Sequence, residues 1–124
     1  MIPFLIFLAA ALDGPDAAPA LETVKTCDKA GMMALTRAEP HRRAEWAAAA
    51  YAEQQAIARE RSALLAPGAA PVAKTSYDLA LAGLDARQRR LDDARAVELS
   101  WRTLVDELRA DFLANCAPSK GGRD

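Results

Sequence analysis

Residues 77–112 read YDLALAGLDARQRRLDDARAVELSWRTLVDELRADF, and this stretch decides the fold. It contains no proline, and apolar residues recur in it every seven positions. The repeat, called the seam below, consists of Tyr77, Leu84, Leu91, Val105 and Phe112, with Ala80, Ala94, Trp101 and Leu108 interleaved. Such a repeat is typical of a helix that packs along a second helix in the manner of a coiled coil. We therefore expect one long helix, capped at Thr75 or Ser76 and ending near Cys116.

The preceding part of the chain is expected to supply the partner helix. Residues 40–65 are rich in Ala, Glu, Gln and Arg, which are good helix formers. Their apolar stripe consists of Ala49, Ala50, Ala56, Ile57, Ala63 and Leu64. Residues 66–71 read APGAAP, which indicates a loop between the two helices.

A shorter helix is predicted over residues 21–38, ending where Glu39-Pro40 interrupts the helical pattern. The predicted fold class is all-α. It consists of a long antiparallel, coiled-coil-like helical hairpin with a short N-terminal helix. The alternative is a compact three-helix bundle, in which the break at Glu39-Pro40 folds the first helix back.

The N-terminal residues have the composition of a signal peptide. Residues 2–12 are uncharged and mostly apolar, but they are fewer than the roughly 20 that a membrane helix needs. A polar stretch follows and ends in Ala18-Pro19-Ala20, which fits the small-x-small cleavage pattern. We expect a signal peptide over residues 1–20, with Ala9-Ala10-Ala11 as a second cleavage site; the alternatives are a buried N-terminal helix and an uncleaved anchor. The protein is then exported, periplasmic or secreted, without stable membrane insertion after leader removal.

Cleavage after residue 20 leaves one small domain, residues 21–116, and a disordered tail, residues 117–124. The complete chain of 124 residues carries a formal charge of −1, and loss of Asp13 and Asp16 changes it to +1. Basic and acidic residues alternate along the chain, so nothing indicates a nucleic-acid partner.

Cys27 and Cys116 are the only two cysteines and lie near opposite ends of this domain. In an oxidising compartment such a pair predicts one disulfide. In an antiparallel hairpin, the residue numbers of any two residues that face each other add up to the same total. The midpoint of the two cysteines falls between residues 71 and 72, at the edge of the predicted loop, which supports their pairing. With His41 as the single histidine, the cysteines cannot form a metal site at the usual spacing.

Two charged residues, Arg87 and Glu98, stand where the seam requires apolar side chains. A charge on a packed face is costly unless it is paired or reaches water. The hairpin register supplies these partners: Arg42 or Arg43 for Glu98, and Glu53 or Glu60 for Arg87. The alternative is that both side chains lie at the edge of the seam and extend into solvent.

No arrangement in the sequence indicates an enzyme. It has no phosphate-binding loop and no nucleophile elbow, so we expect no catalytic residues, no metal and no cofactor.

The function predicted instead is a protein-binding module of the cell envelope. Its predicted interaction surface consists of Met32, Met33, Trp46, Trp101 and Phe112; these residues alternatively form ordinary core. The second hypothesis is a self-associating spacer, a homo-oligomer in which another copy completes the seam.

Overall fold

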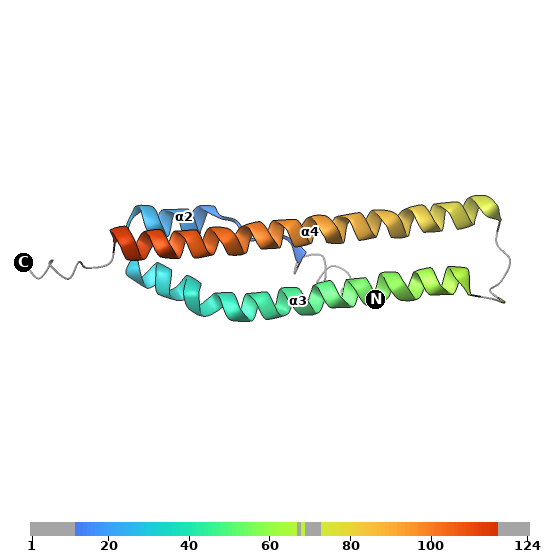
Figure 1. Ribbon diagram of the computed structural model, residues 1–124, viewed down its shortest axis with the longest axis horizontal. Helices are drawn as coiled ribbons and strands as arrows, with labels where there is room; N and C mark the ends of the chain where they lie inside the picture. The colour runs from blue at the N-terminus through green and yellow to red at the C-terminus, as the bar shows by residue number, and fades with distance from the viewer. Residues whose placement is uncertain (1–11, 67, 69–72, 117–124) are drawn as a thin grey trace, which may run out of the picture. The chain divides into compact units, whose positions relative to one another are not determined.

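The computed structural model describes residues 12–66, 68 and 73–116. It contains the helices α2 (Ala18–Lys25), α3 (Lys29–Leu65) and α4 (Lys74–Asn115), as labelled in Figure 1. No strand occurs among the described residues, so the all-α prediction is confirmed. No helix in this part of the chain combines the length and hydropathy needed to cross a membrane.

The chain divides into two compact units, which are described separately. The loop unit comprises Met1–Asp13 and Ala44–Ala96, and the disulfide unit comprises Gly14–Arg43 and Val97–Asp124. Both α3 and α4 contribute a segment to each unit. Residues 1–11 of the predicted signal peptide, residues 1–20, and the predicted tail, residues 117–124, lie outside the described residues.

In the loop unit, α3 and α4 run antiparallel. Gln54 Nε2 donates to Gln88 Oε1 at 2.9 Å, and further along α3 Arg61 binds the earlier α4 residue Asp85 at 2.8 Å. Between the two segments lies an apolar cluster of Ala50, Ile57, Leu84 and Leu91, with Leu12, Trp46 and Leu64 packed against it. The seam positions of this unit are therefore covered from within the chain.

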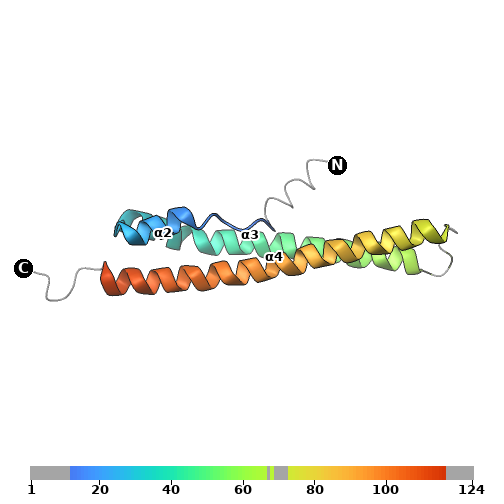
Figure 2. The ribbon, with the colours of Figure 1, turned by 90° about the horizontal axis from the view of Figure 1, so that it is seen from above.

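In the disulfide unit, α2 lies beside α3 and α4 (Figure 2). The buried cluster consists of Ala20, Trp101, Val105 and Leu108, with Ala17, Val24, Leu35 and Leu104 packed against it. Helix α2 thus contributes Ala20 and Val24 to an apolar core that α4 dominates. A short N-terminal helix is present as predicted, but the helix predicted over residues 21–38 is not one element, because residues 29–38 belong to α3.

The chain turns at Thr26, Cys27 and Asp28, and the predicted break at Glu39-Pro40 is wrong. Cys27 adopts a positive φ of 51°, which ends α2. Asp28 then caps α3, because its Oδ1 accepts a hydrogen bond from Gly31 N at 3.0 Å.

Pro40 lies inside α3, so the three-helix alternative with a fold at this residue is not formed. A proline inside a helix removes one backbone hydrogen bond. Contacts of the neighbouring Glu39 with Arg42 and Arg43, one turn further on, hold the helix together across this site. At the start of α4 the predicted cap at Thr75 or Ser76 is wrong, because the helix begins at Lys74 and both residues lie inside it.

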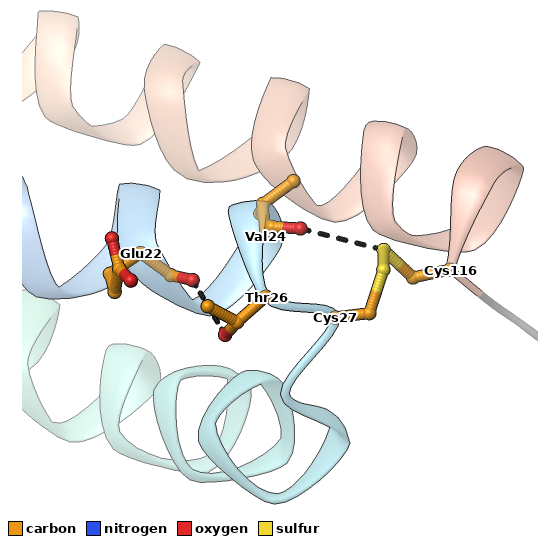
Figure 3. Close-up of a disulfide and its surroundings, with 5 residues drawn as sticks. All are labelled: Glu22, Val24, Thr26, Cys27 and Cys116. Atoms are coloured by element: carbon orange, nitrogen blue, oxygen red, sulfur yellow. Dashed lines mark hydrogen bonds between the residues drawn. A yellow bond between two sulfur atoms is a disulfide. The ribbon is translucent and has the colours of Figure 1, made fainter.

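The predicted disulfide between Cys27 and Cys116 is confirmed. Their Cα atoms lie 5.2 Å apart, and the bond spans 89 residues of sequence (Figure 3). The carbonyl oxygen of Val24 lies 3.5 Å from Cys116 Sγ. Because a disulfide sulfur carries no proton, this is a close polar contact without a donated hydrogen. The bond fastens the turn before α3 to the residue that follows α4.

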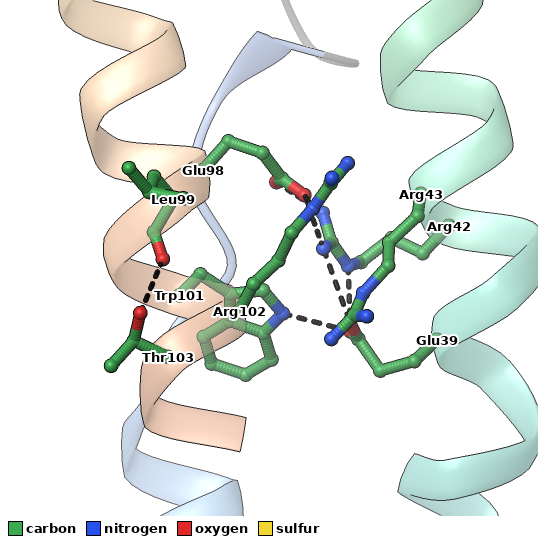
Figure 4. Close-up of polar contacts among 8 residues, drawn as sticks. All are labelled: Glu39, Arg42, Arg43, Glu98, Leu99, Trp101, Arg102 and Thr103. Atoms are coloured by element: carbon green, nitrogen blue, oxygen red, sulfur yellow. Dashed lines mark hydrogen bonds and ion pairs between the residues drawn. The ribbon is translucent and has the colours of Figure 1, made fainter. Parts of the chain in front are cut away.

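Glu98 is buried and paired with Arg42, as predicted from the hairpin register. The Arg42 Nη1 and Nη2 atoms each lie 2.8 Å from one carboxylate oxygen of Glu98 (Figure 4). Arg102 Nε donates to the same carboxylate at 2.6 Å. Burial raises the pKa of Glu98, but the hydrogen bonds from Arg42 and Arg102 outweigh it and lower the pKa. The carboxylate is therefore buried in its charged form.

Glu39 is a second buried carboxylate, and it was not predicted from the sequence. Its oxygens accept hydrogen bonds from Arg42 Nε at 2.7 Å, Arg43 Nε at 2.8 Å and Trp101 Nε1 at 2.8 Å. Burial raises the pKa of Glu39, yet the hydrogen bonds from Arg42, Trp101 and Arg43 lower it to about 2. Arg42 thus links two buried carboxylates, one on each helix.

Arg87 in the loop unit also finds its predicted partners. Its Nη2 lies 2.6 Å from Glu53 Oε1, and its Nη1 pairs with Glu60. The hydrogen bond to Glu53 is the main reason why the pKa of Arg87 is raised, against the effect of burial. Both charges that interrupt the seam are therefore paired across the helices.

We expect the substitution Glu98→Arg to lower the free energy of unfolding by about 3–5 kcal/mol, because it removes the buried carboxylate that pairs with Arg42 and Arg102 and places a further positive charge beside them. Adding Arg42→Glu should restore part of the loss. Urea unfolding of the four proteins in this double-mutant cycle measures the coupling. The matched control is Asp92→Arg, which breaks the exposed pair with Arg95 and should cost about 0.5 kcal/mol or less. Additive effects of Glu98→Arg and Arg42→Glu would contradict the pairing.

Removal of the disulfide should lower stability without changing the fold. Closing a loop of 89 residues stabilises the chain by about 4 kcal/mol on the chain-entropy model. We expect the Cys27→Ser, Cys116→Ser double variant to unfold at a lower temperature than the oxidised protein and to be insensitive to reductant. Thermal unfolding with and without dithiothreitol measures both effects. Equal unfolding temperatures for the oxidised and reduced wild-type protein would show that the bond contributes nothing.

Acid should destabilise the disulfide unit between about pH 5 and pH 2. The pKa of Glu39 falls from 4.5 to about 2 on folding, so its contribution is complete above pH 4.5 and is lost as pH falls through 2. The pKa of Glu98 is lowered in the same direction. Urea midpoints measured over this range should fall with pH, and Glu39→Gln should flatten the fall. An unchanged pH dependence in Glu39→Gln would contradict the assignment.

Candidate functional site

The five residues of the predicted interaction surface are divided between the two units and differ in burial. Met32, Met33 and Phe112 line the same groove of the disulfide unit. Trp101 is 7% exposed and belongs to the buried cluster, where its indole binds Glu39. Trp46 packs against the cluster of the loop unit. The prediction is therefore corrected: Trp101, Met32 and Phe112 are buried, Trp46 packs against the core of its unit, and Met33 alone of the five is an exposed large apolar side chain.

The first turns of α3 and the last turns of α4 form this groove, which has a volume of about 330 Å³ and is called the basic groove below. Its lining residues are Lys29, Met32, Met33, Thr36, Arg37, Arg109, Phe112 and Leu113. Five of them come from α3 and three from α4. The groove lies next to the disulfide in sequence, since Met32 follows Cys27 by five residues and Phe112 precedes Cys116 by four.

The apolar part of the basic groove has buried and exposed members. Met32 and Phe112 are 6% and 7% exposed, so they belong to the core, whereas Met33 and Leu113 are 45% and 62% exposed. Exposed apolar side chains beside a groove are typical of a surface that another molecule covers. Methionine adapts its unbranched side chain to different ligand shapes, which suits such a surface.

Three basic side chains, Lys29, Arg37 and Arg109, surround these apolar residues. No ion pair joins any of the three to another residue in the described part of the chain. Asp106, one helical turn before Arg109, lines an adjoining hollow with it but forms no ion pair with it. The groove therefore presents uncompensated positive charge around an apolar centre.

The basic rim, Lys29, Arg37 and Arg109, was not predicted from the sequence, although the spacing of these residues along each helix can be read from it. Lys29, Met33 and Arg37 follow one another at intervals of four, which places them on one face of a helix. Arg109 and Leu113 have the same spacing on α4. Only the pairing of the two helices shows that the two faces meet, and the predicted break at Glu39-Pro40 left that pairing open.

The groove is suited to binding rather than to covalent chemistry. Its single hydroxyl group, on Thr36, donates a hydrogen bond to the Met32 carbonyl oxygen at 2.9 Å and has no neighbouring base in the lining. Across the described residues, no cluster of three His, Cys, Asp or Glu side chains is arranged to hold a metal ion. The arrangement offers an apolar contact area and three cations, which together recognise an apolar ligand that carries negative charge.

A larger groove in the loop unit is a weaker candidate. It has a volume of about 640 Å³, and its lining residues are Glu60, Ala63, Leu64, Ala80, Gly83, Leu84, Arg87 and Arg90. Two of its three charged side chains, Glu60 and Arg87, already bind each other. Among the described residues only its Arg90 is left without an ion pair, against three such side chains in the basic groove.

Comparisons with known proteins identify no relative of this chain. The chain matches no known protein family, no curated protein and no solved structure.

Proposed function

We propose that this protein is an exported, non-enzymatic binding module of the cell envelope, and that its basic groove binds a protein segment. The segment carries an apolar side chain flanked by Asp or Glu. The observation that carries this proposal is a set of three basic residues, Lys29, Arg37 and Arg109, that line the groove together with the exposed Met33 and Leu113 and form no ion pair with any residue that the structure describes.

Charge complementarity argues for an acidic partner. Positive groups at the rim of an interface accelerate association with an acidic partner and disfavour basic ones. The apolar centre supplies affinity, because covering Met33 and Leu113 removes apolar surface from water. A groove of about 330 Å³ accommodates one or two side chains, so we expect a short anchoring segment.

The disulfide supports the proposed localisation. Structural disulfides form and persist in the periplasm and outside the cell, whereas the cytosol keeps thiols reduced. The bond between Cys27 and Cys116 fastens the two helix ends that carry the basic groove. Export and the formation of this binding surface are therefore linked in the proposal.

The alternative function, a self-associating spacer, has less support. It required the α4 seam to be free for a second copy of the chain. Four of its five heptad residues, Leu84, Leu91, Val105 and Phe112, are instead buried within their own units. We expect a monomer by light scattering coupled to gel filtration, and a stable dimer would revive the spacer hypothesis.

A synthetic helical peptide with leucines flanked by glutamates should bind the oxidised protein, as measured by fluorescence anisotropy. We expect Leu113→Asp to weaken binding by about tenfold or more, because it places a carboxylate among the apolar contacts. Arg37→Glu and Arg109→Glu should weaken binding and reduce its dependence on salt. The same peptide with lysines in place of the glutamates should not bind measurably.

The chain offers a matched control for this experiment. Leu99 lies on α4 in the same unit and is 67% exposed, close to the 62% of Leu113, but it does not line the basic groove. Leu99→Asp should leave peptide binding unchanged. Equal effects of Leu99→Asp and Leu113→Asp, or equal binding of the lysine peptide, would contradict the proposed site.

A further inference from the structure

Residues 12–20 pack as part of the folded domain, although the sequence pattern assigns them to the leader. Leu12 packs against the apolar cluster of the loop unit. Ala17 and Ala20 pack in the cluster of the disulfide unit, where Ala20 is 5% exposed. Cleavage after Ala20 would remove all three side chains from the mature protein.

Gly14 shows that this segment is fitted closely to its unit. A Cβ atom at Gly14 would lie 2.6 Å from Cγ1 of Val97, which is closer than two carbon atoms approach. Valine is β-branched and its side chain has little freedom to move aside. Glycine, which has no Cβ atom, therefore lets the chain pass α4 at this distance. A segment that is cleaved off would not need such close packing.

The first turn of α2 also depends on residues before Leu21. Asp16 Oδ1 accepts a hydrogen bond from Ala18 N at 3.0 Å, and the Ala17 carbonyl oxygen accepts one from Leu21 N at 3.0 Å. The bond between Ala20 and Leu21 lies inside α2, Ala18–Lys25. Its cleavage would leave five residues of this helix without their first turn, and so short a helix is unstable.

We infer that the leader ends at Ala11, so that the mature protein begins at Leu12 and residues 12–20 are the first part of its domain. This inference rests on the proposed export. The cleavage site is Ala9-Ala10-Ala11, which lies outside the described residues. Its sequence has small residues at the first and third positions before the bond, directly after the apolar residues 2–8. Hydrolysis consumes one water, giving a carboxylate on Ala11 and an amino group on Leu12.

N-terminal sequencing and intact mass of the full chain, expressed with its own leader and recovered from the envelope fraction, test the inference. We expect a first residue of Leu12. A first residue of Leu21 in that fraction would overturn the inference and leave the proposed export intact. A chain that begins at Met1, in the envelope or in the cytoplasm, would overturn the inference, and the cytoplasmic location would overturn export as well.

Two matched substitutions separate the cleavage sites. Ala9→Glu places a charged side chain three residues before the bond after Ala11, and precursor should accumulate. Ala18→Glu makes the same change before the bond after Ala20, where Ala18 is exposed and an acidic residue suits the start of a helix. We expect Ala18→Glu to leave the Leu12 terminus unchanged. A block of processing by Ala18→Glu, with normal processing of Ala9→Glu, would overturn the inference.

A stability measurement tests the structural part independently of processing. Purified oxidised chains that begin at Leu12 and at Leu21 are compared by thermal unfolding. We expect the Tm of the shorter chain to be lower by about 5 °C or more, since it lacks the packing of Ala17 and Ala20. Equal Tm values would show that residues 12–20 are dispensable and would overturn the inference.

Discussion

The disulfide between Cys27 and Cys116 is the constraint on which the disulfide unit depends. It holds the turn before α3 against the end of α4, and the basic groove is made from the residues that follow and precede these cysteines. Cys27 has a φ of 51°, a conformation that costs a residue with a side chain about 1 kcal/mol. Glycine would adopt it freely, but only cysteine supplies the bond. The covalent link and the capping by Asp28 together hold this strained turn in place.

The two buried carboxylates define the register of α3 and α4 within this unit. An unpaired carboxylate away from water is so costly that Glu39 and Glu98 tolerate few alternative arrangements. Arg42 binds both of them, and Trp101 adds an indole N–H to Glu39. A shift of one helix by a single turn would separate these groups. The network therefore selects one pairing among the several that an alanine-rich helix such as α3 allows on packing grounds alone.

The sequence was sufficient to predict the features that follow from the seven-residue repeat and the pairing of the charges that interrupt it. The seven-residue spacing predicted α4, the cysteine numbers predicted the antiparallel register, and Glu98 was predicted to bind an arginine because it interrupts the seam. Local features, such as helix breaks, were harder to predict from the sequence. A proline in isolation predicts a break, but contacts of Glu39 with Arg42 and Arg43 support α3 through Pro40.

The candidate site was only partly predictable for the same reason. Met32, Met33 and Phe112 were identified because they are large apolar residues near the cysteines. The role of Trp101 depends on its contact with Glu39, which is 62 residues away in sequence. The basic rim combines residues from two helices whose facing sides became known only from their pairing. A pattern along one helix does not show which residues of a second helix lie beside it.

The distribution of the stabilising interactions has a consequence for how the chain unfolds. The covalent bond, the capped turn and both buried carboxylates belong to the disulfide unit, whereas the loop unit relies on its apolar cluster and on pairs such as Arg61 with the half-exposed Asp85. Parts of a protein that are stabilised by different interactions can open with different free energies. Each unit also contains one of the two tryptophans, Trp46 in the loop unit and Trp101 in the disulfide unit. The indole fluorescence of each single-tryptophan chain would therefore report the opening of one unit, and together they would distinguish stepwise from all-or-none unfolding.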